Sequence, residues 1–296
     1  MPRFSIVLAA FAFIGPAFAQ DKPVEVKVQK AAAIEKLTKA GQLKPTSVET
    51  ADLLVYTSWP EPKAKVLAAT VQKIYDLAYK TLKFEPKDPV WPGKLTVFFV
   101  PERKEYNAFI RLVEQRKPET GDTTSVQVRS KEPYILVGLE LDSKFSDADM
   151  AGEVGAAVAE ALLNTKSGVT AGAAMLPTWI TTGFAKLMVL KMDGNSAKVG
   201  AYRTKVKALF AKGKAATAKS SDAWAEAKTK ETDTIAISVV DFLLFGPDPT
   251  KFTKVISGFK PSDERPTPTL EQALEVADYK PDTLDVAWKA WVAKGK

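Results

Sequence analysis

The stretch Leu95-Thr96-Val97-Phe98-Phe99-Val100 decides the fold of this 296-residue chain. It is a short apolar run rich in β-branched and aromatic residues, and the turn signal Pro92-Gly93 stands just before it, so it predicts a buried β-strand. A second apolar run, Leu53–Thr57, predicts another strand. Between the two, apolar residues recur at helical spacing from Pro62 to Phe84, which predicts a long amphipathic helix.

The strand signals end before the middle of the chain. Glu102–Arg116 has the apolar spacing of a helix, and two more strands are predicted at Ser125–Arg129 and Tyr134–Leu139. From Ser146 onward the apolar period is helical almost to the end. The pattern therefore predicts an α+β fold, with a small N-terminal sheet and its helices followed by an all-helical C-terminal subdomain.

The first nineteen residues have the three parts of a secretory signal peptide. Arg3 supplies the positive start, Phe4–Ile14 is the apolar core, and Ala17-Phe18-Ala19 is a small-x-small cleavage site before Gln20. The alternative is an N-terminal membrane anchor, but this run is shorter than the about 20 apolar residues that span a bilayer. We expect an exported protein, periplasmic or extracellular, with no transmembrane segment after removal of the signal.

These patterns divide the chain into four expected segments. They are a signal peptide at 1–19, an N-terminal strap or linker at 20–50 with a short helix at Ala31–Leu43, a mixed α/β subdomain at 51–145 and a helical subdomain at 146–296. We expect 51–296 to form one unit.

The composition excludes several kinds of chemistry. The chain contains no histidine and no cysteine. A Ser-His-Asp or Cys-His nucleophile cannot be assembled without them, and neither imidazole nor thiolate is available to bind zinc. We therefore expect no metal and no cofactor. The formal net charge of +7 is a mild excess for a chain of this size, and it does not by itself indicate nucleic-acid binding.

One pair of segments carries a resemblance to a known family. The helix predicted at Asp147–Asn164 is crowded with small residues, and after a loop comes Leu176-Pro-Thr-Trp-Ile-Thr-Thr-Gly-Phe-Ala. This resembles the gluzincin-type, peptidase-MA-like zinc metallopeptidases. In that family a helix with His-Glu-x-x-His is followed by a segment like Leu-Pro-x-Trp-Leu-x-Glu-Gly-x-Ala, whose glutamate is the third zinc ligand. The order of elements is similar over about residues 50 to 294, so the resemblance implies a zincin-like fold.

The chain departs from the family at every metal position. In the alignment that we prefer, Gly152 and Ala156 replace the two histidines, and Thr182 stands in place of the ligand glutamate. Zinc needs three protein ligands in such a site, so the resemblance implies a degenerate member without zinc peptidase activity. The degenerate motif positions are Gly152, Glu153, Ala156, Trp179, Thr182 and Gly183.

Two functions follow from this resemblance. The first is a pseudoenzyme whose former substrate cleft binds a peptide or a cell-envelope polymer without cutting it. The alternative is a metal-independent hydrolase that uses Glu153 with Glu160, which lie on nearly the same helix face about 10 Å apart along the axis. A second possible alignment places Ala156, Ala157 and Glu160 over the motif. Such a carboxylate pair is also typical of a solvated or ion-paired helix face.

A separate feature is a basic stretch at residues 194–221, which contains no acidic residue. It could attract an anionic envelope polymer, a lipid head group or nucleic acid, although only Tyr202 and Phe210 interleave with the charges, so the nucleic-acid signal is not strong. The same pattern is also typical of an exposed helix followed by a lysine- and alanine-rich loop. The cations are Lys198, Arg203, Lys205, Lys207, Lys212, Lys214 and Lys219.

Overall fold

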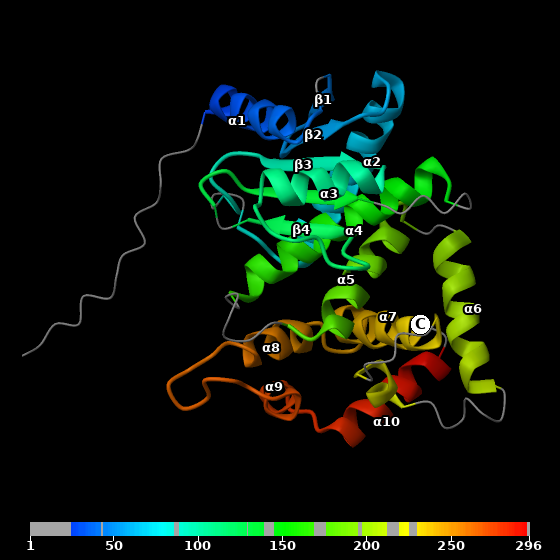
Figure 1. Ribbon diagram of the computed structural model, residues 1–296. Helices are drawn as coiled ribbons and strands as arrows, with labels where there is room; N and C mark the ends of the chain where they lie inside the picture. The colour runs from blue at the N-terminus through cyan, green and yellow to red at the C-terminus, as the bar shows by residue number, and fades with distance from the viewer. Residues whose placement is uncertain are drawn as a thin grey trace, which may run out of the picture.

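The computed structural model describes residues 25–42, 44–85, 89–128, 130–138, 145–168, 176–194, 197–211, 219–224 and 230–294. The signal peptide predicted at 1–19 lies outside these ranges. Within them the chain combines one mixed β-sheet with many helices (Figure 1). No helix in the described ranges is both long enough and apolar enough to cross a membrane.

The sheet has the strand order β1-β2-β3-β5-β4. Its three central strands, β2, β3 and β5, are mutually parallel, and the edge strands β1 and β4 are antiparallel to their neighbours. Every residue of the central strands is buried, which explains why these strands appear in the sequence as continuous apolar runs. The strands are β1 (Thr46–Glu49), β2 (Leu53–Thr57), β3 (Leu95–Val100), β4 (Thr124–Gln127) and β5 (Tyr134–Gly138).

Helices cover both faces of this sheet. On one face α1 (Val26–Lys39) and α3 (Arg103–Leu112) pack on every second residue of the central strands, for example Phe98. On the other face α2 (Glu61–Thr81) and α4 (Asp147–Ser167) pack on the intervening strand residues, for example Val97. The N-terminal part is thus a three-layer arrangement.

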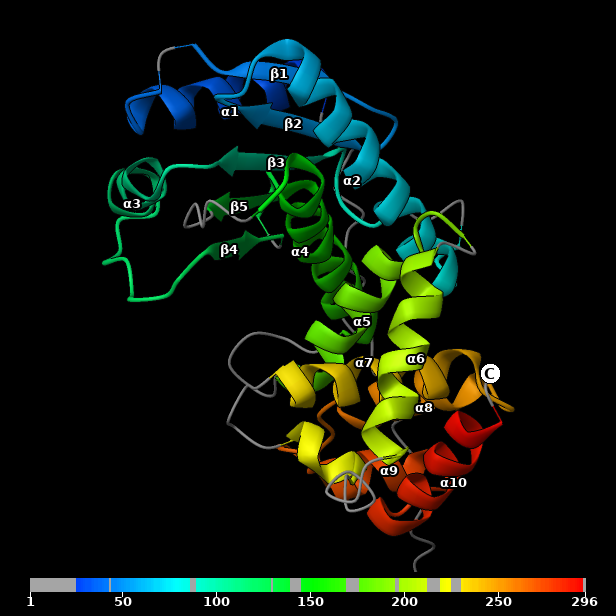
Figure 2. The same cartoon turned by 90° about the vertical axis from the view of Figure 1, so that its right-hand side faces the viewer.

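The remaining elements of the described chain are helical, and they lie beyond α4 on the side away from β1 (Figure 2). They share one continuous hydrophobic core with α2, α4 and the adjoining sheet face. The predicted mixture of an N-terminal sheet with a helical C-terminal part is confirmed at this level. The elements are α5 (Thr178–Lys191), α6 (Ala197–Ala211), the 3₁₀ helix η2 (Ser220–Trp224), α7 (Lys230–Phe245), α8 (Thr250–Gly258), α9 (Leu270–Val276) and α10 (Pro281–Ala293).

Residues 25–49, predicted as a strap or linker, contribute to the sheet and its core. Strand β1, which the sequence analysis did not predict, pairs with β2, and Leu37 of α1 is buried in the core between α1, α3 and the sheet. The predicted helix at Ala31–Leu43 begins earlier, at Val26, and ends at Lys39. The signal for β1 was weak because a four-residue edge strand that is half exposed contains few apolar residues.

Local backbone chemistry sets where two other helices end. Helix α3 ends at Leu112, short of the predicted Arg116, and Gln115 has a φ of 55°, which a continuing helix cannot contain. Helix α4 begins at a capping box between Ser146 and Asp149 and ends at Gly168, whose φ is 64°.

Candidate functional site

Small residues bring α4 into close contact with the helices on either side of it. A Cβ atom added at Gly155 would overlap the side chain of Ile74 on α2. A Cβ atom added at Gly152 would lie 3.2 Å from Cγ1 of Val189 on α5. Gly155 and Gly152 therefore serve the close packing of α4, although at Gly152 the Val189 side chain would need to shift only slightly to admit a Cβ atom.

Helices α4 and α5 run antiparallel, since Gly152 near the start of α4 approaches Val189 near the end of α5. Thr182, seven residues before Val189, therefore lies about 10 Å further along α5. Gly183 faces a different helix, because a Cβ atom there would lie 2.9 Å from the carbonyl oxygen of Ala236 on α7.

Trp179 belongs to the core at the start of α5. Its side chain is buried, and its ring centroid lies 6.1 Å from that of Trp224. Within the described residues the indole N–H of neither tryptophan has a hydrogen-bond partner. The tryptophan of the resemblance therefore packs α5 against η2.

The two glutamates of α4 have different surroundings. Glu153 is exposed, and among the described residues its side chain makes no hydrogen bond or ion pair. Glu160 is half-buried and has an interaction partner. Ala156 is half-buried against the core. Across the described ranges no group of three or more Asp, Glu, His or Cys is placed to hold a metal ion.

Strand β4 presents a free edge that the sequence did not identify. Gly138 N–H donates to the Thr123 carbonyl oxygen at 2.8 Å, and Thr124 pairs with Val137. Because hydrogen-bonded and non-hydrogen-bonded pairs alternate in an antiparallel ladder, the main-chain groups of Thr124 and Val126 point away from β5. Among the described residues these groups have no hydrogen-bond partner. The Val126 side chain is 40% exposed.

A polar network fixes the loop that leads into β4. Arg116 lies between two carboxylates, 2.8 Å from Glu114 and 2.9 Å from Asp122. The Tyr106 hydroxyl donates to Asp122 at 2.8 Å, and the Tyr134 hydroxyl donates to Glu114 at 3.2 Å. Glu114 is nearly buried, with 4% of its side chain exposed. The network holds β4 from the α3 side of the sheet.

The ionisation of this network is set by burial and by its hydrogen bonds. Burial, together with the hydrogen bond to Asp122, raises the pKa of Tyr106 above its usual range. Burial and the nearby charge of Glu114 raise the pKa of Tyr134 in the same way. Burial opposes the charged form of Arg116, but the hydrogen bonds that it donates to Glu114 and Asp122 outweigh that effect and raise its pKa. The tyrosines are thus neutral donors and Arg116 is a fixed cation.

The basic stretch lies on α6 and beyond it. Lys198, Lys205 and Lys207 are exposed and Arg203 is half-buried, whereas Lys212 and Lys214 lie outside the described residues. Lys219 is exposed just before η2, and its main-chain N–H donates to Asp222. Within the described chain none of these cations forms an ion pair with a carboxylate.

Among the described residues, the edge of β4 and the cations of α6 are two features that present unpaired groups to solvent. No protein-family model matches the chain, and no curated protein matches it.

Proposed function

We propose that this chain is an exported, non-catalytic metallopeptidase-like protein, periplasmic or extracellular, that binds an extended peptide or a peptide-like stretch of a cell-envelope polymer. The observation that carries the proposal is the free edge of β4. An extended peptide can add a strand there, since the outward main-chain groups of Thr124 and Val126 offer both donors and acceptors. No cofactor or metal is needed for such binding.

The packing of α4 supports a role without zinc chemistry. A Cβ atom at Gly152 would lie in tight contact with Val189, and the described residues contain no group of three or more Asp, Glu, His or Cys that could hold a metal ion. A water molecule activated for hydrolysis needs a metal or a positioned base. Under this proposal, the resemblance to gluzincin-type peptidases extends to the arrangement of helices and strands and to the substrate-binding cleft. It does not extend to the zinc-dependent reaction.

The edge of β4 also fits peptide binding in its composition. Its four residues are Thr, Ser, Val and Gln, so no charged side chain or proline protects the edge from another strand. The exposed Val126 side chain adds apolar contact beside the main-chain groups. The Arg116 network holds the approach to β4 in place, so less conformational freedom is lost when a peptide binds.

A proline substitution tests this proposal at a single main-chain N–H group. The N–H of Val126 points away from β5, so Val126→Pro removes a free donor and leaves the β4–β5 ladder intact. The matched control is Ser47→Pro, because the Ser47 N–H points to the free edge of β1 in the same sheet. The probe is an array of random twelve-residue peptides, with affinities of the tightest binders measured in solution.

We expect binders for the wild-type protein, a loss of affinity of about tenfold or more in Val126→Pro, equivalent to about 1.4 kcal/mol, and unchanged affinity in Ser47→Pro. Equal binding by all three proteins would contradict the proposal. The same peptides and a set of esters and polysaccharides should be tested for hydrolysis by the wild-type protein and by Glu153→Gln. Turnover that is lost in this variant would favour the hydrolase alternative with Glu160.

A further inference from the structure

We propose that α6 is a second interaction surface, which binds a linear, hydrophilic polyanion of the anionic polysaccharide class. This surface is separate from the edge of β4 and does not depend on the peptide-binding proposal. Helix α6 lies at the right-hand side of the helical part in Figure 1, and in Figure 2, viewed from that side, it lies in front of the other helices.

The sequence of α6 separates its inward and outward sides. Val206 is buried, and Tyr202, Leu209 and Phe210 pack against the core. At about 100° per residue, the opposite side of the helix is formed by small neutral residues, all of them exposed. They are Gly200, Ala201, Thr204 and Ala208.

The cations lie along both borders of this small-residue side. Lys198 and Lys205 are seven residues apart on one border, about 10 Å along the axis, and Arg203 and Lys207 are about 6 Å apart on the other. An extended chain laid along the helix would thus have positive charge on both sides and no bulky side chain beneath it. Charges spread over two turns favour a ligand with repeated anionic groups over a compact one.

These cations are not neutralised by the protein itself, in contrast to neighbouring lysines. Lys186 is paired with Asp233 at 2.6 Å, and Lys191 with Asp241 at 3.0 Å. The four cations of α6 have no carboxylate partner within the described chain. Two of the four have an acidic neighbour: hydrogen bonds from Ser146 and, to a smaller extent, the charge of Lys198 lower the pKa of Asp149, and Arg203 lines a pocket together with Asp241.

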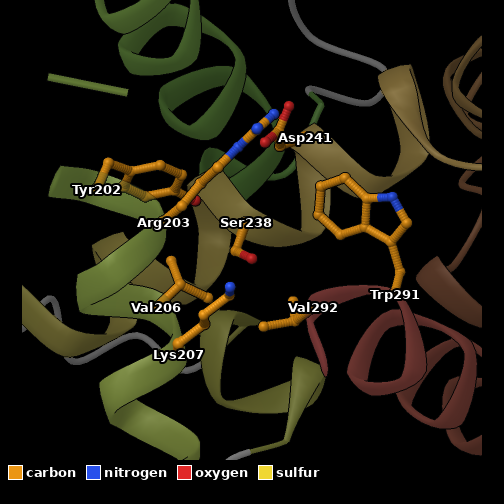
Figure 3. Close-up of a pocket in the computed structure, with 8 residues that line it drawn as sticks. All are labelled: Tyr202, Arg203, Val206, Lys207, Ser238, Asp241, Trp291 and Val292. Atoms are coloured by element: carbon orange, nitrogen blue, oxygen red, sulfur yellow. The ribbon is translucent and has the colours of Figure 1, made fainter. Parts of the chain in front are cut away.

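A small pocket between α6, α7 and α10 adjoins this surface (Figure 3). Arg203 and Lys207 extend over its α6 side, and Ser238 lies in its wall. The Nε atom of Arg203 is buried and has no hydrogen-bond acceptor in the described structure. A buried donor of this kind requires an acceptor, and Asp241, toward which Arg203 points in Figure 3, carries a carboxylate in the same pocket. The cations left to meet an external anion are therefore the exposed lysines of α6.

Two other classes of macromolecule fit this surface less well. The two aromatic residues of α6, Tyr202 and Phe210, pack against the core, so they form no platform on which bases could stack. The exposed large apolar side chains of the described chain include none from α6, so this helix has no face to insert into a bilayer.

The test compares two double charge reversals. Lys205→Glu with Lys207→Glu changes one cation on each border of α6. Lys73→Glu with Lys80→Glu makes the same charge change on α2, where both lysines are exposed and without an ion pair among the described residues. The probe is polygalacturonate, measured by titration at several salt concentrations, with neutral dextran as the uncharged control. Melting temperatures of both variants should match that of the wild-type protein.

We expect wild-type binding that weakens linearly on a log–log plot as salt is raised. The α6 variant should bind about tenfold or more weakly, the α2 variant should bind within about twofold of the wild type, and dextran should not bind. Equal losses in both variants, or no binding at low salt, would overturn the proposal. Tighter binding to oligothymidylate or to phosphatidylglycerol vesicles, lost in the α6 variant, would overturn the assigned class. Val126→Pro should bind polygalacturonate normally, which separates this result from the β4 proposal.

Discussion

The two edge strands of the sheet have almost the same sequence and opposite surroundings. Strand β1 is Thr-Ser-Val-Glu and β4 is Thr-Ser-Val-Gln, and each pairs antiparallel with a buried strand. In β1 the Val48 side chain packs on the core and Ser47 is exposed. In β4 the alternation of buried and exposed residues is reversed, so Ser125 is buried and Val126 is exposed.

Neighbouring charges make the difference between these edges larger. Glu49 at the end of β1 is paired with Lys30 at 2.6 Å and with Lys94 at 2.8 Å. A charged and paired residue on an edge strand discourages the addition of another strand. Gln127 at the matching position of β4 has no charge. The comparison teaches that register and neighbours, rather than composition, decide which edge is available for binding.

The largest effect is expected from removing the support of β4. Arg116→Ala leaves Glu114 buried without its cation, and breaking a buried pair of this kind typically costs 3–5 kcal/mol. Since 37% of the Arg116 side chain is exposed, we expect a smaller loss of about 2–3 kcal/mol in the free energy of unfolding. Chemical denaturation measures this loss. Arg116→Lys should recover only part of it, because a lysine cannot bridge both carboxylates in the same geometry.

The corresponding change at β1 should matter less and should depend on pH. Hydrogen bonds from Lys30 and Lys94 lower the pKa of Glu49 from 4.5 to about 2. The stabilisation is therefore complete above the unfolded pKa and is lost as the pH falls toward about 2. Because the side chain of Glu49 is 39% exposed, solvent screening reduces the effect, and Glu49→Gln should cost less than about 1 kcal/mol at pH 7.

Urea denaturation at a series of pH values checks this prediction. The difference between wild type and Glu49→Gln should shrink as the pH falls from 5 toward 2. A difference that stays constant over this range would mean that the ion pairs do not stabilise β1.

The smallest effect is expected when β4 is given the sequence of β1. Gln127→Glu places a carboxylate on an exposed edge, so the free energy of unfolding should change by less than about 0.5 kcal/mol. If β4 binds peptides by strand addition, this variant should discriminate against acidic peptides relative to basic ones, and titration with matched peptide pairs measures that preference. An unchanged preference would place the bound peptide away from Gln127.

Two of the three central strands, β2 and β3, could be predicted from sequence with their full bounds. Leu53–Thr57 and Leu95–Val100 are buried on both faces, so each is a continuous apolar run between turn signals. Strand β1 was not predicted because only alternate residues are half-buried. The start of α4 was predictable, since Ser146 precedes the first helical turn and caps it.

The candidate sites were harder to predict from the sequence than the central strands. The strand near Ser125 was predicted, but its place at the edge depends on the strand order, which a single segment does not encode. The network of Arg116 joins Tyr106, Asp122 and Tyr134 across turns of the chain and has no local spacing that would reveal it. The cations of α6 were visible in the sequence, whereas the absence of partners for them required the fold.

Amide hydrogen exchange at the two edge strands tests the central claim most directly. The protein is compared alone and with the tightest-binding array peptide, and the amides of Thr124 and Val126 are followed beside those of Ser47 and Glu49. Strand addition at β4 predicts slower exchange at Thr124 and Val126 on peptide binding, with Ser47 and Glu49 unchanged. Protection at β1, or protection that leaves Thr124 and Val126 unchanged while the peptide is bound, would contradict the account.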